Sequence, residues 1–225
     1  VAGYPYRQVP FTSVKLAPGS FFGERLKAVQ KVTIPLAFGK CETEHRYENF
    51  VKAAHPSDDY VVNKFMQFPF DDTDVYKTIE GASYMLQSFP DKRLEAYIDS
   101  VLDIVAKAQE TDGYLYTART MNPRHPHPWA GMKRWEKVEE LSHELYNLGH
   151  MLDAAVAHEQ ATGSKKFLDI ARRYADCVVR EVGPRAGQAC VVPGHQIAEM
   201  GLAKLYLATG DKRYLDEAKF FLDYR

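Results

Sequence analysis

The sequence contains few cysteines, no surplus of charge of either sign and no long apolar run. Its 225 residues include three cysteines, which form neither a close pair nor a spacing typical of a metal site. We expect Cys41, Cys177 and Cys190 to be buried free thiols. Lys and Arg number 29 against 30 Asp and Glu. The chain therefore lacks the clustered positive field of a nucleic-acid-binding protein.

No apolar segment approaches the ~20 residues of a membrane-spanning helix, so we expect no membrane contact. No segment predicts a strong β-strand either. A hydrophobic content of 45% with 12% aromatic residues indicates an ordinary folded protein. The sequence leaves the compartment open, with a periplasmic or secreted location favoured over a cytoplasmic one.

A helix–turn–helix unit occurs twice in the C-terminal half of the chain. One copy begins at His143 and the other at Gly194, and they align through their Ala-Thr-Gly segments at 161–163 and 208–210. Each copy opens with a Gly-His pair: Gly149-His150 and Gly194-His195. Repetition at a period of roughly fifty residues is typical of stacked supersecondary units that bury their apolar faces against one another.

Apolar periodicity predicts an all-α protein. Residues 1–20 form an extended arm, because Pro5, Pro10 and Pro18 oppose a helix. Helices are expected at 21–36, around Tyr47, Phe50 and Val51, at 71–89, from 91 to Asp112-Gly113, and as four helices of the repeated unit. The predicted helices number about eight. A closed α/α toroid of the six-hairpin type needs about twelve helices, so the count suggests an incomplete toroid. We therefore assign residues 21–225 to one portion of such a barrel.

Residues 114–139 form a long irregular insertion rich in Trp, Tyr, His and Arg. Loops of this length inside a compact domain are usually functional or disordered, and we favour a functional loop. Trp129, Trp135 and Tyr116 could stack against sugars, or they could clasp the loop to the core. The sequence leaves both alternatives open.

Histidines near the repeated helices are the first candidates for a binding site. His143, Asn147 and His150 fall on one helix face, and Glu144 lies beside them. This stripe could line the mouth of a helical ring, where imidazoles can bind hydroxyl groups or exchange protons. The alternative for His150 and for His195 is an ordinary core histidine.

Several carboxylates could serve as acid, base or ligand. Asp72 and Asp74 begin a predicted helix, where capping is the favoured alternative to a role in a site. Glu140, Glu144 and Glu199 are the other candidates, but sequence cannot give the separation that glycoside hydrolysis requires. His195 and Glu199 have the spacing of two metal ligands on a helix, yet no third ligand follows, so a zinc site ranks low.

Four blocks together resemble a known family: PFDDTDVYKTIEGASY, QETDGYLYT, the segment from RW to HELYNLGHMLDAAVAHEQATG, and PGHQIAEMGLAKLYLATGDKRYL. They are similar to the catalytic domain of the β-L-arabinofuranosidases of glycoside hydrolase family 127 and the related family 146. The resemblance runs over nearly the whole chain, in the order of the family.

The resemblance implies an α/α six-hairpin barrel that releases terminal β-L-arabinofuranose from plant glycans with retention. It implies sugar contacts for His150 and His195, and more weakly for His143; Glu144, Asp72 and Trp129 complete the candidate substrate-binding set. It also implies a cysteine nucleophile on a zinc ion and a glutamate acid/base, which we expect beyond Arg225. No cysteine here matches that motif, so we expect no metal ligand within the chain and no activity or tight zinc binding from the chain alone.

Alternatives within and outside the enzymes stay open at this point. Uronyl hydrolases and sugar epimerases share the toroid architecture, so the substrate class depends on the resemblance alone. A non-catalytic helical-repeat scaffold or glycan-binding module would show short loops and a uniform polar outer face. The long aromatic loop favours an enzyme whose partners are a carbohydrate and the remainder of its barrel.

Overall fold

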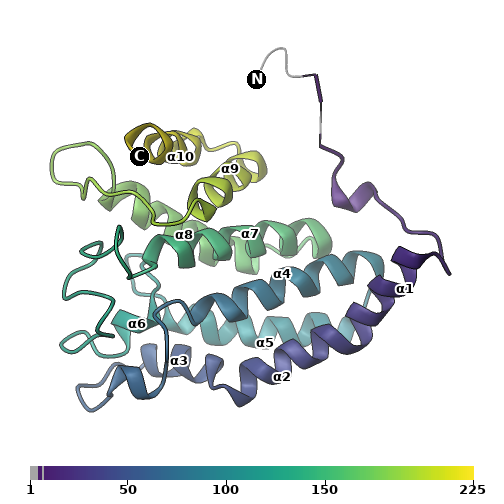
Figure 1. Ribbon diagram of the computed structural model, residues 1–225, viewed down its shortest axis with the longest axis horizontal. Helices are drawn as coiled ribbons and strands as arrows, with labels where there is room; N and C mark the ends of the chain where they lie inside the picture. Colours follow the sequence, from purple (N-terminus) through teal and green to yellow (C-terminus); the bar gives the residue numbers. More distant parts are fainter. Residues whose placement is uncertain (1–4, 7) are drawn as a thin grey trace.

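The computed structural model describes residues 5–6 and 8–225, and it consists of helices arranged in two layers (Figure 1). The α-helices are α1 Phe21–Ala28, α2 Ile34–Thr43, α3 Arg46–Ala53, α4 Asp72–Ser88, α5 Lys92–Ala108, α6 Thr117–Thr120, α7 Glu144–Thr162, α8 Lys166–Glu181, α9 Ile197–Thr209 and α10 Lys212–Tyr224. A π-helical turn, Val29–Thr33, joins α1 to α2, and short 3₁₀ helices lie at Phe11–Ser13 and Val62–Lys64. Within the described ranges there is no β-strand, only one isolated bridge. The all-α prediction is confirmed.

The helices pack as an arc of antiparallel hairpins. In one layer α2, α4, α7 and α9 lie side by side, and in the other α3, α5, α8 and α10 do so (Figure 1). The sequence explains this division. The outer helix α8 has one apolar face and one charged stripe, with Asp169, Arg172 and Arg180 exposed. The central helix α7 is buried on nearly every side. With α1 to α2 counted as one continuous helix and the four-residue α6 omitted, the described residues hold the eight helices that were predicted.

The repeated unit folds twice into the same hairpin. Gly163 after α7 and Gly210 after α9 both adopt left-handed backbone angles, with φ of 76° and 73°. Each donates its N–H to a carbonyl of the preceding helix at 2.7 Å, as a left-handed helix end requires. The threonines before them, Thr162 and Thr209, each donate a side-chain bond back into the helix at 2.7 Å. The Ala-Thr-Gly alignment therefore marks two equivalent turns.

The two Gly-His pairs, in contrast, are not equivalent. Gly149-His150 lies inside α7, whereas Gly194-His195 lies in the turn before α9. A side-chain carbon on Gly149 would come within 2.5 Å of the Ile197 backbone, and one on Gly201 within 2.8 Å of the Gly149 carbonyl oxygen. Glycine at both positions lets α7 and α9 pack closely. This contact brings the start of α9 against the second turn of α7.

Two helix boundaries differ from their predictions. The first helix does not end at Leu36. The π-helical turn ends just before Pro35, which lies in the first turn of α2 and cannot donate a helical hydrogen bond, and α2 continues to Thr43. The helix α5 ends at Ala108 instead of at Asp112-Gly113. Gln109 turns its backbone to extended angles, and its side-chain amide donates to the Gly113 and Ile170 carbonyls. A tertiary contact thus shortens this helix.

The arm expected at residues 1–20 partly lies outside the described residues, at 1–4 and 7. Its described part packs against α4: Phe11 is edge-on to Tyr84 at 4.9 Å, and Gln87 donates to the Thr12 carbonyl. Ser20 caps α1 by accepting from the Gly23 N–H. The boundary between arm and barrel domain remains a prediction.

The three cysteines are free, as expected, but their burial differs. Cys41 and Cys177 are buried, whereas Cys190 is exposed in the connector between α8 and α9. The expectation of three buried thiols is therefore wrong for Cys190. None of the helices in the described part of the chain has the length and apolarity of a membrane span.

Candidate carbohydrate-binding pocket

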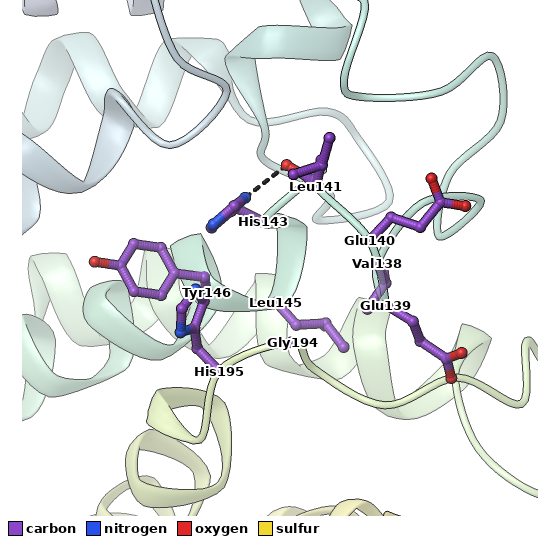
Figure 2. A pocket seen from close by; sticks show the side chains of 9 residues that line it. All are labelled: Val138, Glu139, Glu140, Leu141, His143, Leu145, Tyr146, Gly194 and His195. Carbon is purple, nitrogen blue, oxygen red and sulfur yellow. Dashed lines mark hydrogen bonds between the residues drawn. The ribbon is translucent and has the colours of Figure 1, made fainter.

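A cavity of about 300 Å³ lies where the loop before α7, the first turn of α7 and the turn before α9 meet (Figure 2). The aromatic rings of His143, Tyr146 and His195 gather on one side of it. The remaining wall is formed by Val138, Glu139, Glu140, Leu141, Leu145 and Gly194. The cavity therefore combines a cluster of rings with polar groups, in the size range of a small-molecule site.

His143 is held in one protonation form by its surroundings. It precedes α7 with a left-handed φ of 59°, a conformation that costs a residue other than glycine about 1 kcal/mol or more. Its Nδ1 is 2.6 Å from the Leu141 carbonyl oxygen and must donate to it. Burial lowers the pKa of His143, and the hydrogen bond only partly opposes this. The ring is therefore neutral near pH 7 and presents Nε2 as an acceptor.

Tyr146 is the centre of the ring cluster. Its ring centroid lies 5.5 Å from His143, 5.1 Å from His195 and 4.5 Å from His150. Lys77, from the neighbouring helix α4, donates to the Tyr146 hydroxyl oxygen at 2.8 Å. Because the phenol oxygen accepts from an ammonium group, its own hydrogen is free to be donated to a ligand.

His195 and His150 reach the cluster from different elements. His195 is exposed, and its ring lies 5.2 Å from that of His143. His150 is half-buried behind Tyr146, one turn further along α7, and does not line the cavity wall. Its Nδ1 is enclosed and has no hydrogen-bond partner in the described structure. Burial, followed by the charge of Lys77, lowers the pKa of His150 to about 4, so this ring is also neutral near pH 7.

Glu144, the first residue of α7, is fully buried and does not line the cavity. Its carboxylate accepts from the Tyr114 hydroxyl at 2.6 Å, from the Ser142 hydroxyl at 3.1 Å and from the Trp135 backbone N–H at 3.2 Å. Burial raises the pKa of Glu144 to about 7. The structure thus places this predicted sugar ligand inside the protein, where it ties the loop to the start of α7.

Asp72 is also enclosed. Its carboxylate accepts from the Thr117 N–H at 3.0 Å and from the Thr117 hydroxyl at 2.5 Å, which joins α4 to α6. Burial raises the pKa of Asp72 to about 7. Asp74 pairs with Arg46 at 2.8 Å. The capping alternative is therefore wrong for both residues, since neither carboxylate binds the N–H groups of its own helix.

Asn147 and Glu199 do not face the cavity either. Asn147 is buried, and its amide donates to the Pro69 carbonyl oxygen at 3.1 Å. Glu199 is buried and accepts from Arg225 at 2.6 Å. Because α9 begins only at Ile197, His195 and Glu199 do not form the four-residue helical spacing that two ligands on one helix would need.

The aromatic residues of the long loop divide into two groups. Trp135 and Tyr116 are buried; Trp135 donates from Nε1 to Glu181 at 3.0 Å, and Tyr116 donates to the Ser142 carbonyl. Both side chains hold the long loop against the core of the protein, and we call this set of contacts the loop clasp. The alternative of a stacking surface is wrong for these two residues. Trp129 is 36% exposed and lies away from the 300 Å³ cavity.

The described residues provide one group that could in principle hold a metal ion: Asp112, Cys177 and Glu181, whose ligand atoms lie within 4.8 Å of one another. The guanidinium of Arg134 already occupies this position, 2.6 Å from Asp112 and 3.1 Å from Glu181. Burial and the charge of Glu181 raise the pKa of Cys177 to about 12. A protonated thiol beside a fixed cation does not fit zinc.

Two residues of the cluster were not among the predicted site residues. Tyr146 could have been recognised, because it lies three residues after His143 and four before His150 in the HELYNLGH segment. From Glu144 to His158, every residue of α7 is buried except Tyr146 and His150. Lys77 gave no signal in the sequence, since only the packing of α4 against α7 brings its ammonium group to the phenol.

Comparison with known proteins gives a consistent answer. Residues 13–225 match the family model described as β-L-arabinofuranosidase, GH127 catalytic domain. A non-reducing end β-L-arabinofuranosidase from Bifidobacterium longum subsp. longum is 39% identical over 181 residues, which are 80% of this chain and 26% of that protein.

Solved structures of the same family share the fold. A GH127 β-arabinofuranosidase superposes with a TM-score of 0.95 at 70% identity, over 99% of this chain and 34% of its own. A GH127 β-L-arabinofuranosidase from Geobacillus stearothermophilus T6 superposes with a TM-score of 0.82 at 36% identity, over 92% of this chain and 32% of its own. This chain therefore spans between a quarter and about a third of the length of these relatives. It belongs to the GH127 β-L-arabinofuranosidase family, as part of the family's catalytic domain.

Proposed function

We propose that this chain is the N-terminal part of the barrel of a retaining glycosidase, and that the enzyme releases terminal β-L-arabinofuranose from plant glycans. Membership of the family over residues 13–225 supports the substrate class. The observation that carries the proposal is the cluster of His143, Tyr146 and His195 around a cavity of about 300 Å³. Hydrogen-bonding rings beside a small cavity suit a sugar with several hydroxyl groups.

Each ring of the cluster has a distinct part in this proposal. His143 offers Nε2 as an acceptor because its Nδ1 donates to Leu141. Tyr146 donates its hydroxyl hydrogen because Lys77 already donates to its oxygen. His150 does not line the cavity; its ring packs edge-on against Tyr146, with 4.5 Å between the ring centroids, and holds that ring in place. His195 covers the sugar from the side of α9.

We place the reactive groups outside the described residues, in the remainder of the barrel. The family resemblance implies a zinc-bound cysteine nucleophile and a glutamate acid/base, and none of the three cysteines here matches that motif. Large apolar side chains on α9 and α10, namely Met200, Leu207 and Leu222, are 47%, 80% and 61% exposed. Their exposure supports the proposal that a further layer of helices packs on this edge of the arc. The chain itself binds and orients the sugar.

The test uses the protein in which this chain is joined to the rest of the barrel. We expect His195→Ala and His150→Ala each to lower kcat/KM for a β-L-arabinofuranoside by about 10- to 100-fold. The first removes a hydrogen bond to the sugar worth roughly 1–3 kcal/mol in the transition state, and the second removes the ring that holds Tyr146 in place. The matched control is His125→Ala, an exposed histidine that lines neither the cavity nor the ring cluster. Circular dichroism and thermal unfolding check that folding is retained. Wild-type rates in both variants would show that the cluster is not the sugar site.

A further inference from the structure

An aromatic ridge leads away from the ring cluster. The Phe70 ring is 4.8 Å from the His143 ring, measured between centroids. Phe68 stacks on Phe70 at 5.0 Å with the ring planes 7° apart, and Trp129 lies 5.9 Å from Phe68. All three ridge residues are partly accessible, Trp129 most of all. The ridge thus forms a continuous row of rings from the pocket to Trp129.

A second cavity, of about 490 Å³, opens at the far end of the ridge. Trp129 forms part of its wall, together with polar side chains from the end of α2, the start of α3 and the loop before α4. These include Asn63, Lys64 and Gln67, which are all exposed. An accessible indole beside amide and ammonium groups offers both a flat apolar face and several hydrogen-bonding groups.

Hydrogen bonds to the backbone hold the ridge residues in place. Asn147 of α7 donates to the Pro69 carbonyl oxygen, between the two phenylalanines. Asp71 accepts from the backbone N–H of Phe68 at 3.4 Å and is itself paired with Arg46 at 3.1 Å. At the other end the buried His127 accepts from the Trp129 N–H at 3.2 Å. Rings held in this way lose little conformational entropy when a ligand binds.

We propose that Phe70, Phe68 and Trp129 form a binding surface for the sugar units on the leaving-group side of the terminal arabinofuranose. This inference rests on the proposed function, because it takes the ring cluster as the site of the terminal sugar. Successive rings lie 4.8–5.9 Å apart, so a glycan that leaves the pocket along the ridge meets an unbroken apolar surface that ends at the accessible Trp129. The carbon–hydrogen faces of sugars pack well on aromatic rings, while their hydroxyl groups need the polar groups of the second cavity.

The experiment compares two substrates of the protein that carries the complete barrel. Methyl β-L-arabinofuranoside has no sugar on its leaving-group side, whereas a linear trisaccharide of β-L-arabinofuranose has two. Both are assayed by release of L-arabinose. We expect Trp129→Ala to lower kcat/KM for the trisaccharide about tenfold and to change hydrolysis of the methyl glycoside less than twofold. Trp129→Phe keeps a flat ring and should restore most of the loss.

The matched control is Met132→Ala, which removes an exposed side chain of the same loop that lines neither cavity. It should leave both rates unchanged. If Trp129→Ala leaves the trisaccharide rate unchanged, the ridge does not bind the glycan. If it lowers both rates and the melting temperature together, Trp129 instead packs against another part of the barrel, and the inference is also wrong. Failure of the wild-type protein to hydrolyse either arabinofuranoside contradicts the proposed function itself, a result distinct from the other two.

Discussion

Glycine at position 149 sets the distance between the two helices that hold the histidines. A methyl group there would lie 2.5 Å from the Ile197 carbonyl carbon and 2.7 Å from the Ala198 nitrogen. Those atoms are backbone atoms and cannot rotate away. The helix α9 would have to move, and His195, which precedes it by two residues, would move with it.

The variant Gly149→Ala should therefore destabilise the protein by about 1–3 kcal/mol through overpacking, although alanine is the better helix former. The matched control is Gly39→Ala in α2, where an added carbon meets no atom within 4 Å; it should stabilise by up to about 1 kcal/mol. Urea unfolding of both variants measures the difference. Equal effects at the two positions would show that the α7–α9 contact is looser than described.

Burial of the Glu144 carboxyl group makes the stability of the protein depend on pH. Burial raises its pKa to about 7 in the folded protein, whereas the unfolded chain should titrate near the ordinary value of about 4.3. Between these values the unfolded state loses its proton first. The stability contributed by Glu144 is therefore complete below about pH 4.3 and is lost as the pH rises through about 7.

We expect the free energy of unfolding of the wild type, relative to Glu144→Gln, to fall by up to ~3 kcal/mol between about pH 5 and about pH 8. Glutamine keeps the shape and an acceptor oxygen but does not titrate. Other groups, including the histidines, contribute equally to both proteins and cancel in the difference. Chemical denaturation at the two pH values provides the measurement, and a pH-independent difference would contradict this account.

At the scale of elements, Arg134 joins the long loop to α8. Its guanidinium binds Glu110 at 2.8 Å, Asp112 at 2.6 Å and Glu181 at 3.1 Å, and it lies 4.1 Å from the centroid of the Tyr114 ring. The opposing carboxylates raise the pKa of Arg134. The same loop continues into residues 138–141, which form the wall of the pocket. The clasp therefore positions that wall.

Removing this clasp in Arg134→Ala should cost about 1–2 kcal/mol, because three partly buried carboxylates lose their shared cation while solvent screens part of the effect. The comparison is Arg124→Ala in the same loop, which breaks only an exposed pair with Asp58 and should change stability by less than about 0.5 kcal/mol. Thermal unfolding gives the stabilities, and limited proteolysis reports opening of residues 121–141. A loop equally resistant to protease in both variants would speak against the clasp.

At the scale of the whole molecule, the chain is an arc whose layers end in open edges (Figure 1). At one edge Leu207 is 80% exposed, and at the other Phe21, Phe22 and Leu36 are 68%, 68% and 61% exposed. The relatives are about three times as long as this chain, whose matched part covers 26–34% of their length. Under the proposed function, we expect the reactive groups in the part of the barrel that completes the arc.

The 225-residue chain purified alone should therefore neither hydrolyse p-nitrophenyl β-L-arabinofuranoside nor bind zinc tightly. The physical reason is that no cysteine is among the residues that line the described pocket, and that the one cluster of possible metal ligands in the described residues is already neutralised by Arg134. Spectrophotometric assay and titration with a zinc indicator provide the measurements. Turnover by the chain alone would place the nucleophile among these residues.

The sequence alone determined the helical class, the repeated hairpin and the candidate histidines, because these depend on local periodicity and on short motifs. The Ala-Thr-Gly turns are an example: glycine at a left-handed helix end acts through its own backbone, and both copies fold alike. Tyr146 was also within reach, since its spacing from His143 and His150 places all three near one face of α7.

Only the tertiary structure decided which polar residues face the pocket. Asp72, Glu144, Asn147 and Glu199 stand in helical patterns like those of surface or site residues, yet each finds its partner on another element and is buried there. Lys77 reaches Tyr146 only because α4 packs on α7. Periodicity fixes which residues share a helix face, but the neighbour that the face meets depends on contacts between segments far apart in the chain.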